Sequence, residues 1–380
     1  MGELLEFHNG FNGSSEKYGR GIPLISVMDI LSNDFITSEN IRIKADLTEK
    51  EFQRFKVGYG DVLFQRSSEN VEDAGTSNVY LDERKCAVFG GFVICGKKKA
   101  EYVSLFLKYG LTNKGVRAQI TSKAQGAQHI NVSQDTLQGT VILLPSQYEQ
   151  EKIGNYFRYL DALITLHQRK YEKLLKVKKS MLEKMFPRDG ADVPEIRFDG
   201  FTDAWEQRKA IDIADYSKGN GYSKGDLTDA GTPIILYGRL YTKYQFAISE
   251  VDTFAVPRNG AVYSQGNEVI VPASGETAED IARASAVEKS GVLLGGDLNI
   301  LRPFDFINPL FLALAISNGE PQKELTKKAQ GKSVVHIHNT DIQDVTIAYP
   351  LRTEQDRIVS VFRQLDDLIT LHQRKYNWYR

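Results

Sequence analysis

One set of residues has the side chains of a metal-dependent nuclease site. Asp61, Glu83 and Lys85 offer two carboxylates for a magnesium ion and an ammonium group for the attacking water. Their spacing is loose, and the second half of the chain has no equivalent at matching register. A stand-alone nuclease is therefore kept as an alternative function. Substitution of Asp61 separates it from a non-catalytic role, because only a nuclease would lose cleavage by the purified chain.

Two other motifs match known ligand sites only in part. His336 and His338 alternate as they would on one face of a strand, but no cysteine or carboxylate cluster accompanies them as further metal ligands. Gly331-Lys332-Ser333 resembles the end of a phosphate-binding loop, yet Thr326 occupies the position that requires glycine. The Asn-Pro-Pro-aromatic motif of adenine methyltransferases does not occur. We therefore predict no catalytic residue and no metal site.

Polar side chains suited to reading DNA base edges gather in loop-like stretches. Arginine and lysine pair with guanine, and asparagine and glutamine pair with adenine. A first group lies in the first half of the chain, and we expect a rough counterpart in the second half. The two groups are Gln65, Arg66, Ser67, Ser68 and Asn70, and Tyr263, Ser264, Gln265 and Asn267.

A third group of polar residues is shared by the two halves. Lys123 with Gln125 matches Lys328 with Gln330, and Lys332 adds another charge to the second cluster. Shared residues cannot distinguish two different sequences, so contact with phosphates suits them better than contact with bases.

The strongest pattern in the sequence is an internal repeat. Residues 145–171 reappear as residues 350–376, with 17 of 27 positions identical and an unbroken LITLHQRKY at the end of each copy. The offset of 205 continues upstream and drifts to 210 near Gly21 and Gly231. Such a period is too long for a solenoid repeat. The sequence therefore contains a duplicated domain in which one framework carries two different surfaces.

Each half has the pattern of a mixed α/β domain. Short runs rich in Val, Ile, Phe and Tyr are broken by Gly, Asn and Asp, which is typical of strands, and a short helical stretch follows them. We expect two α+β recognition domains in tandem, each followed by a long helix. The expected bounds are 1–145 for domain 1, 146–190 for the first helix and linker, 191–350 for domain 2 and 351–380 for the second helix.

The segment after Pro145 has the spacing of a coiled coil. Large or apolar residues recur in steps of three and four, with Lys178 as the one clear interruption, and Pro187 ends the run. A lone helix would expose this stripe, so we expect the two copies to pair antiparallel about a pseudo-two-fold axis. The expected seam residues are Ile153, Phe157, Leu160, Ile164, His167, Tyr171, Leu174 and Met181, and Ile358, Phe362, Leu365, Ile369, His372 and Tyr376.

Two histidines occupy equivalent seam positions. His167 and His372 fall at the same place in the two copies. Metal or proton chemistry is one interpretation, but a polar seam residue that fixes the register of the helices is the interpretation we adopt.

Composition limits the class of protein. The chain has 380 residues, enough for two or three domains, and a net charge of −1 with basic clusters at residues 169–188 and 323–332. Such clusters suit local contact with phosphates. Cys86 and Cys95 are expected to be free thiols in a reducing cytoplasm. No run approaches the roughly 18 apolar residues of a membrane span, and the N-terminus has no signal-peptide pattern.

The chain resembles the specificity subunits of type I restriction–modification systems. The resemblance covers essentially its whole length and rests on the duplication, on P-x-x-x-E-Q-x-x-I-x-x-x-F at 145–157 and 350–362, and on the linker PEIRFDGFTDAWEQRK at 194–209. It implies two variable domains that each read half of a split target in double-stranded DNA, and paired helices that set the gap.

The resemblance also implies partners. Two methyltransferase subunits and restriction/translocase subunits would dock on the chain, and S-adenosylmethionine, ATP and magnesium would belong to those partners rather than to this chain. At both ends the chain departs from the family pattern: Met1 faces about Ile211 and Arg380 faces Leu175. A silent or truncated specificity cassette is therefore another alternative, and a coiled-coil scaffold without a DNA role is a third.

Overall fold

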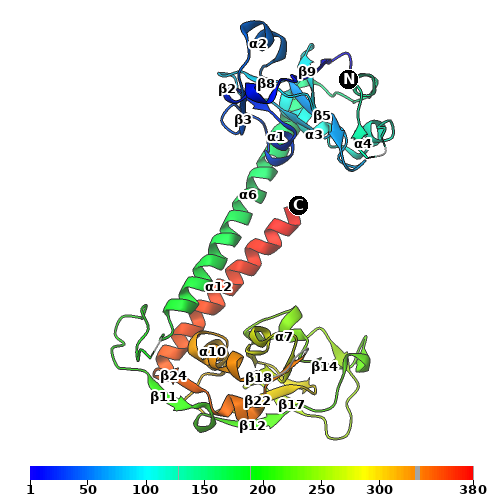
Figure 1. Cartoon of the computed structure of the whole chain (residues 1–380). Helices are drawn as coiled ribbons and strands as arrows, with labels where there is room; N and C mark the ends of the chain where they lie inside the picture. The colour runs from blue at the N-terminus through cyan, green and yellow to red at the C-terminus, as the bar shows by residue number, and fades with distance from the viewer. Residues whose placement is uncertain (127, 189, 330–333, 380) are drawn as a thin grey trace. The chain divides into compact units, whose positions relative to one another are not determined.

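The computed structural model describes residues 1–126, 128–188, 190–329 and 334–379. The chain divides into two compact units, with residues 1–165 in unit 1 and residues 166–378 in unit 2 (Figure 1). Within the described ranges, every helix is too short or too polar to cross a membrane.

Unit 1 is built from short strands and helices that end in a long helix. Its helices are α1 (Val27–Ser32), α2 (Glu49–Phe55), α3 (Ser104–Gly110), α4 (Lys114–Thr121), α5 (Gln134–Gln138) and the first part of α6 (Gln147–Lys184). Its strands are β1 (Leu5–Asn9), β2 (Tyr18–Ile25), β3 (Ile43–Ala45), β4 (Lys56–Val57), β5 (Val62–Gln65), β6 (Ser67–Ser68), β7 (Ser77–Val79), β8 (Ala87–Phe89), β9 (Val93–Lys98) and β10 (Ile130–Asn131).

Unit 2 repeats this series of elements and contains the last part of α6. Its helices are α7 (Arg239–Thr242), α8 (Ala278–Ile281), α9 (Pro309–Ile316), α10 (Gly319–Lys328), α11 (Asn339–Gln343) and α12 (Arg352–Tyr379). Its strands are β11 (Glu206–Lys209), β12 (Ala214–Lys218), β13 (Leu227–Thr228), β14 (Thr232–Ile235), β15 (Ala247–Ile248), β16 (Phe254–Ala255), β17 (Tyr263–Gln265), β18 (Glu268–Pro272), β19 (Ser274–Gly275), β20 (Ser285–Val287), β21 (Ser290–Leu294), β22 (Leu298–Pro303), β23 (Val335–His336) and β24 (Thr346–Tyr349).

The two units share one sheet topology. Unit 1 contains the order β1-β9-β5-β7, and unit 2 contains β12-β22-β18-β20 with β15 added at the edge. The second sheet of each unit contains one parallel pair, β2 with β8 and β14 with β21. Each unit also has a two-stranded ribbon, β6 with β10 and β19 with β23. The prediction of tandem mixed α/β domains is confirmed.

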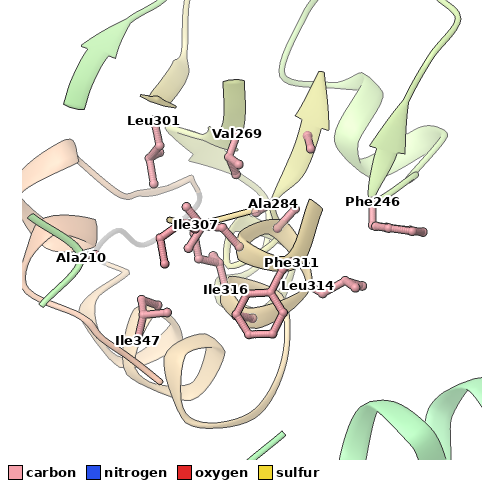
Figure 2. Packing of buried hydrophobic residues seen from close by; sticks show 14 of the residues in the cluster. Ala210, Phe246, Val269, Ala284, Leu301, Ile307, Phe311, Leu314, Ile316 and Ile347 are labelled. Carbon is pink, nitrogen blue, oxygen red and sulfur yellow. The ribbon is translucent and has the colours of Figure 1, made fainter. Parts of the chain in front are cut away.

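Helix α9 forms the centre of the core of unit 2. Its sequence PLFLALAI has no polar face, and the residues from Phe311 to Ile316 are buried. It packs against the sheet residues Val269 and Leu301 (Figure 2). A helix that is apolar on all sides is stable only when other elements cover it completely, and the sheet and the long helices do so here.

Helix α12 pairs antiparallel with the part of α6 that belongs to unit 2. The ring centroids of Phe186 and Phe362 lie 6.4 Å apart near the end of α6, and the imidazoles of His167 and His372 meet farther along. Between them Lys178 Nζ lies 2.5 Å from Asp366 Oδ1. Lys178 therefore interrupts the apolar seam because it forms an ion pair with the other helix.

The expected seam residues differ in how they are covered. Ile358, Phe362, Leu365 and Ile369 are buried, and Leu174 and Met181 pack against the same core. In unit 1, by contrast, Phe157 is 42% exposed, with its ring centroid 5.1 Å from that of Tyr109. The remaining expected seam residues are partly covered, except for buried His167; they are Ile153, Leu160, Ile164, Tyr171, His372 and Tyr376.

The geometry of the histidine pair opposes protonation of its rings. The two Nδ1 atoms lie 2.8 Å apart, so one ring must donate an N–H and the other must accept it. Burial lowers the pKa of both histidines, and the ammonium groups of Lys375 on α12 and Lys170 on α6 lower it further; for His372, His167 also contributes. The folded chain therefore favours neutral rings.

Acidification is expected to weaken the pairing of α6 with α12. An unfolded histidine binds a proton at about pH 6.5, so the unfolded state binds more protons than the folded state below that pH. The contribution of the pair to the free energy of unfolding is complete above pH 6.5 and is lost as the pH falls below that value. Loss of one hydrogen bond of about 1 kcal/mol predicts a fall of about 2–4 °C in the melting temperature of unit 2, measured by calorimetry at pH 7.5 and 5.5.

The double variant His167→Asn and His372→Asn replaces the pair with amides that do not titrate. It should reduce the difference in melting temperature between the two pH values. The exposed His129→Asn provides the matched control and should leave that difference unchanged. An unaltered pH dependence in the double variant would contradict the assignment.

Candidate nucleic-acid interface

Unit 1 contains a polar cleft of about 780 Å³. It lies where the ends of β1, β9 and β6 meet the C-terminal turn of α4, strand β10 and the start of α5. Two cations and several amides and hydroxyls line it, and none of the lining residues is acidic. The lining residues are Asn9, Arg66, Ile94, Ser122, Lys123, Gln125, Asn131, Val132, Ser133, Gln134 and Thr136.

The main chain holds the cationic and amide side chains of the cleft in place. Arg66 N donates to Phe92 O at 2.9 Å, and Arg66 O accepts from Val132 N at 2.9 Å. Gln125 and Asn131 exchange two main-chain hydrogen bonds of 3.0 and 2.8 Å. Arginine and lysine beside amides are the groups that bind phosphates and read base edges. The cleft therefore has the chemistry of a nucleic-acid interface.

The structure separates the first group of expected base-reading residues. Arg66 lines the cleft, whereas Gln65 and Ser68 are buried. Gln65 Nε2 donates to Ser67 O at 2.9 Å, and Ser67 pairs with Asn131 in the ribbon. Asn70 is exposed, and its side chain bonds Asp73 at 3.3 Å. Of this group, only Arg66 joins Lys123 and Gln125 in the cleft.

The expected counterpart of this group in the second half is wrong. Tyr263 pairs with Leu293 of β21, as Lys56 pairs with Val88 of β8. The segment from Tyr263 to Asn267 therefore corresponds to residues 56–60, not to residues 65–70. Ser264 is buried, and its hydroxyl donates to Lys289 O at 2.6 Å.

The ribbon of unit 2 identifies the true counterparts. Ser274 pairs with His336 as Ser67 pairs with Asn131. His336 therefore takes the place of Asn131, and Ala273 takes the place of Arg66 because each directly precedes the ribbon strand. The same framework carries different side chains at equivalent positions.

The basic cluster expected at residues 323–332 is described only in part, because residues 330–333 lie outside the described ranges. Lys328 Nζ lies 2.5 Å from Asp344 Oδ2, and Lys209 Nζ lies 3.2 Å from the other carboxylate oxygen. Asp344 thus partly neutralises Lys328, whose pKa it raises. Gln330, Lys332 and the phosphate-loop-like Gly331-Lys332-Ser333 lie outside the described residues.

The histidines of the His336-Ile337-His338 run have local structural partners. His336 Nδ1 lies 3.1 Å from Ser274 Oγ, and His338 N donates to Asp341 Oδ2 at 2.7 Å at the start of α11. Ile337 between them is buried. Within the described ranges, no group of three His, Cys, Asp or Glu residues is arranged to hold a metal ion.

Asp61 is part of a repeated turn rather than of a nuclease triad. Its carboxylate accepts main-chain N–H groups from Gly58 and Lys98 at 2.9 Å. Burial raises its pKa, and these hydrogen bonds lower it in part. Lys85 Nζ instead lies 3.5 Å from Glu39, and Glu83 is exposed.

The sheet register gives Asp61 an equivalent that the sequence comparison missed. Val62 of β5 pairs with Gly96, and Val269 of β18 pairs with Leu301, so Val62 and Val269 occupy equivalent positions. Asp61 and Glu268 directly precede these two residues and are therefore equivalent too. Glu268 is fully buried and accepts N–H groups from Gln265 and Gly266 at 2.6 and 3.1 Å. An acid at the start of the central strand therefore closes the same turn in both units.

Three amide residues of the cleft were not expected from the sequence. Asn9, Asn131 and Gln134 come from three segments that are distant in the chain. Their residue type suits adenine recognition, but only the sheet and ribbon register bring them to Arg66. The Ser133-Gln134-Asp135-Thr136 run could have indicated the start of a helix at Gln134. In the structure Ser133 Oγ accepts from Thr136 N at 3.1 Å and caps α5.

Comparison with known proteins gives a consistent family. The model of the type I restriction modification DNA specificity domain matches residues 1–176 and 202–377. A putative type I restriction enzyme MjaX specificity subunit of Methanocaldococcus jannaschii is 25% identical over 189 residues, which is 48% of this chain and 44% of that protein. The match thus spans less than half of that relative.

One solved structure shares the fold of this chain. The type I restriction-modification system S subunit from M. genitalium has 13% identity and a TM-score of 0.57 and covers 100% of this chain and 91% of that chain. The HsdS subunit from Thermoanaerobacter tengcongensis has 17% identity and a TM-score of 0.49, with coverage of 98% and 89%. The first of these shows that the fold of the whole chain is shared.

Removal of the Lys123 charge is expected to weaken DNA binding in a salt-dependent way. If Lys123 contacts a phosphate, Lys123→Ala lowers the slope of log affinity against log salt by about 1 and affects all sequences alike. Fluorescence anisotropy of labelled duplex DNA with the purified chain at several salt concentrations measures this slope.

Lys114 at the other end of α4 provides the matched control. It is exposed and does not line the cleft, so Lys114→Ala should leave the slope unchanged. Equal effects of the two variants would show that the cleft is not the site of phosphate contact.

Proposed function

The chain belongs to the type I restriction modification DNA specificity family, and from this premise we propose that it reads a split DNA target for a methyltransferase complex. Each unit would read one half of the target. The chain itself would contribute no catalytic group to methylation or cleavage.

The observation that carries this proposal is one framework with two different reading surfaces. The sheets and ribbons of the two units share their order and register. At equivalent ribbon positions, however, Arg66 and Asn131 in unit 1 correspond to Ala273 and His336 in unit 2. Arginine and asparagine prefer guanine and adenine edges, respectively. Two such surfaces would select two unlike half-sites.

The long helices support a fixed gap between the half-sites. Helix α6 has 38 residues, which corresponds to about 57 Å at 1.5 Å per residue. One turn of duplex DNA is about 34–36 Å long. A spacer of the length of α6 would suit a gap of one to two turns.

A chain that only reads DNA needs partner subunits for methylation and cleavage. We expect two methyltransferase subunits to dock on this chain and restriction/translocase subunits to join them. S-adenosylmethionine would then belong to the methyltransferase subunits, and ATP and magnesium to the restriction subunits. The cytoplasm, where such a complex meets DNA, is the compartment that we infer.

The nuclease alternative has little support in the geometry. Asp61 closes a buried turn, and Glu268 closes the equivalent turn of unit 2, so a structural role explains both acids. A scaffold without a DNA role would not need an acid-free cleft lined with Arg66 and Lys123. The methylation experiment decides whether the chain is a silent or truncated cassette.

Coexpression with a cognate methyltransferase subunit is expected to produce methylated adenines in a split motif with a fixed gap. Mapping of methylated adenines across the host genome measures it. Exchange of residues 1–145 for those of another family member should change one half of the motif and leave the other half and the gap unchanged, because each unit reads one half.

Exchange of residues 191–350 gives the reciprocal control and should change only the other half of the motif. A change of both halves by one exchange would contradict the assignment of one half-site to each unit. If soluble chain produced no new methylation, it would be a silent cassette.

A further inference from the structure

The turn that joins the two sheets of each unit occurs at the same place in both units. It connects β8 to β9 at residues 90–92 in unit 1, and β21 to β22 at residues 295–297 in unit 2. The strands on both sides of the turn pair in the same register in the two units. Phe92 and Asp297, each the last residue of its turn, are therefore equivalent.

Close main-chain packing fixes the path of this turn. A Cβ atom on Gly10 would overlap with Gly90 O, and a Cβ atom on Gly219 would overlap with Gly295 O in unit 2. Glycine is the residue that permits such a close approach of two main chains. The path of the turn thus belongs to the shared framework, whereas the side chain at its last residue differs between the units.

The turn also bonds the residue that precedes the ribbon strand. Arg66 N donates to Phe92 O at 2.9 Å, and Ala273 N donates to Asp297 O at 2.8 Å in the same way. Arg66 lines the cleft of unit 1. Phe92 therefore lies beside the cleft.

The side chain of Arg66 reaches the same turn. Within the described ranges, the one hydrogen bond that its guanidinium donates joins Nη1 to Gly91 O at 3.4 Å. A guanidinium has five N–H donors, so this bond leaves the edge formed by Nε and Nη2 for a bidentate contact with O6 and N7 of guanine. A group suited to guanine is thus held beside the residue that precedes Phe92.

The two side chains at the end of the turn have opposite chemistry. The phenyl ring of Phe92 is 70% exposed and gains little from burial in the folded chain. Asp297 is exposed too and has a φ of 56°, a conformation that aspartate adopts more readily than phenylalanine. Unit 1 therefore presents an apolar surface where unit 2 presents a carboxylate.

We propose that Phe92 is a specificity-determining residue of unit 1, whose ring packs against the 5-methyl group of a thymine next to a guanine bound by Arg66. This methyl group is the apolar feature that bases present in the major groove, and phenylalanine is one of the residues that contact it. The proposal rests on the DNA-reading function proposed above and names a base within one half-site. The carboxylate of Asp297 gains nothing from a methyl group, so the half-site of unit 2 does not use this contact.

Replacement of thymine by uracil removes this methyl group and leaves the pairing of the base unchanged. The probe is duplex DNA with the split motif found by methylation mapping, in which uracil replaces one thymine at a time. For the complex of the chain with its methyltransferase subunit, we expect one uracil in the half-site of unit 1 to weaken binding about fourfold, because one buried methyl group is lost. Competition fluorescence anisotropy measures the affinity. Phe92→Ala should bind the thymine and uracil duplexes equally, and Phe92→Leu, which keeps an apolar group, should retain part of the difference.

Met28→Ala gives the matched control, because Met28 is an exposed apolar residue of unit 1 that does not line the cleft, and it should keep the fourfold difference. Uracil in the half-site of unit 2 should affect the unaltered chain and Phe92→Ala alike. If Phe92→Ala weakened binding of the thymine and uracil duplexes by the same factor, Phe92 would make a contact that does not involve the methyl group, and the proposal would be overturned while the DNA-reading function stood. A half-site of unit 1 in which no uracil weakens binding would overturn it as well. A complex that methylates no split motif would contradict both this proposal and the proposed function.

Discussion

A buried glutamine at the first turn of each long helix joins that helix to its recognition domain. In unit 1 Gln150 accepts from Val103 N at 3.0 Å and donates to Pro145 O at 2.9 Å. In unit 2 Gln355 accepts from Asn308 N at 2.7 Å and donates to Pro350 O at 2.9 Å. A buried amide that loses one partner costs about 1–3 kcal/mol, so the helix cannot turn against its domain without penalty. This constraint is the physical reason for the glutamine of the repeated P-x-x-x-E-Q motif.

The glutamine is kept in both units, whereas the glutamate before it has different surroundings. Glu354 is buried against Arg197, while Glu149 is exposed. The difference comes from the covering segment: β11 and its linker lie over β24 in unit 2, and the described part of unit 1 has no strand in that place. One repeated motif thus serves two purposes. It fastens a helix to a domain in both units, and in unit 2 its carboxylate also binds Arg197 of the covering linker.

Much of the fold could be predicted because the repeat is strong where packing is strict. The duplication, the mixed α/β domains and the antiparallel helices follow from identical residues around the long helices. The cleft could not be assembled in the same way. Between β8 and α6 the offset is 205, as for His167 and His372, but it changes upstream, so Glu268 was not recognised as the equivalent of Asp61 and residues 263–267 were aligned with the wrong segment. Asp and Glu can close the same turn, and strand register tolerates such changes because hydrogen bonds of the main chain do not depend on residue type.

The polar positions of the helix pair define its register where apolar residues cannot. Leucine and isoleucine pack in several alignments, but Lys178 reaches Asp366 in one alignment only. His167 faces His372, its own repeat equivalent. A residue can face its equivalent in an antiparallel pair only where an axis that exchanges the two helices crosses them, so the histidines mark that axis. A shift by one turn would separate the two rings and part Lys178 from Asp366, which disfavours other registers. The helix pair therefore has one register and one length of overlap.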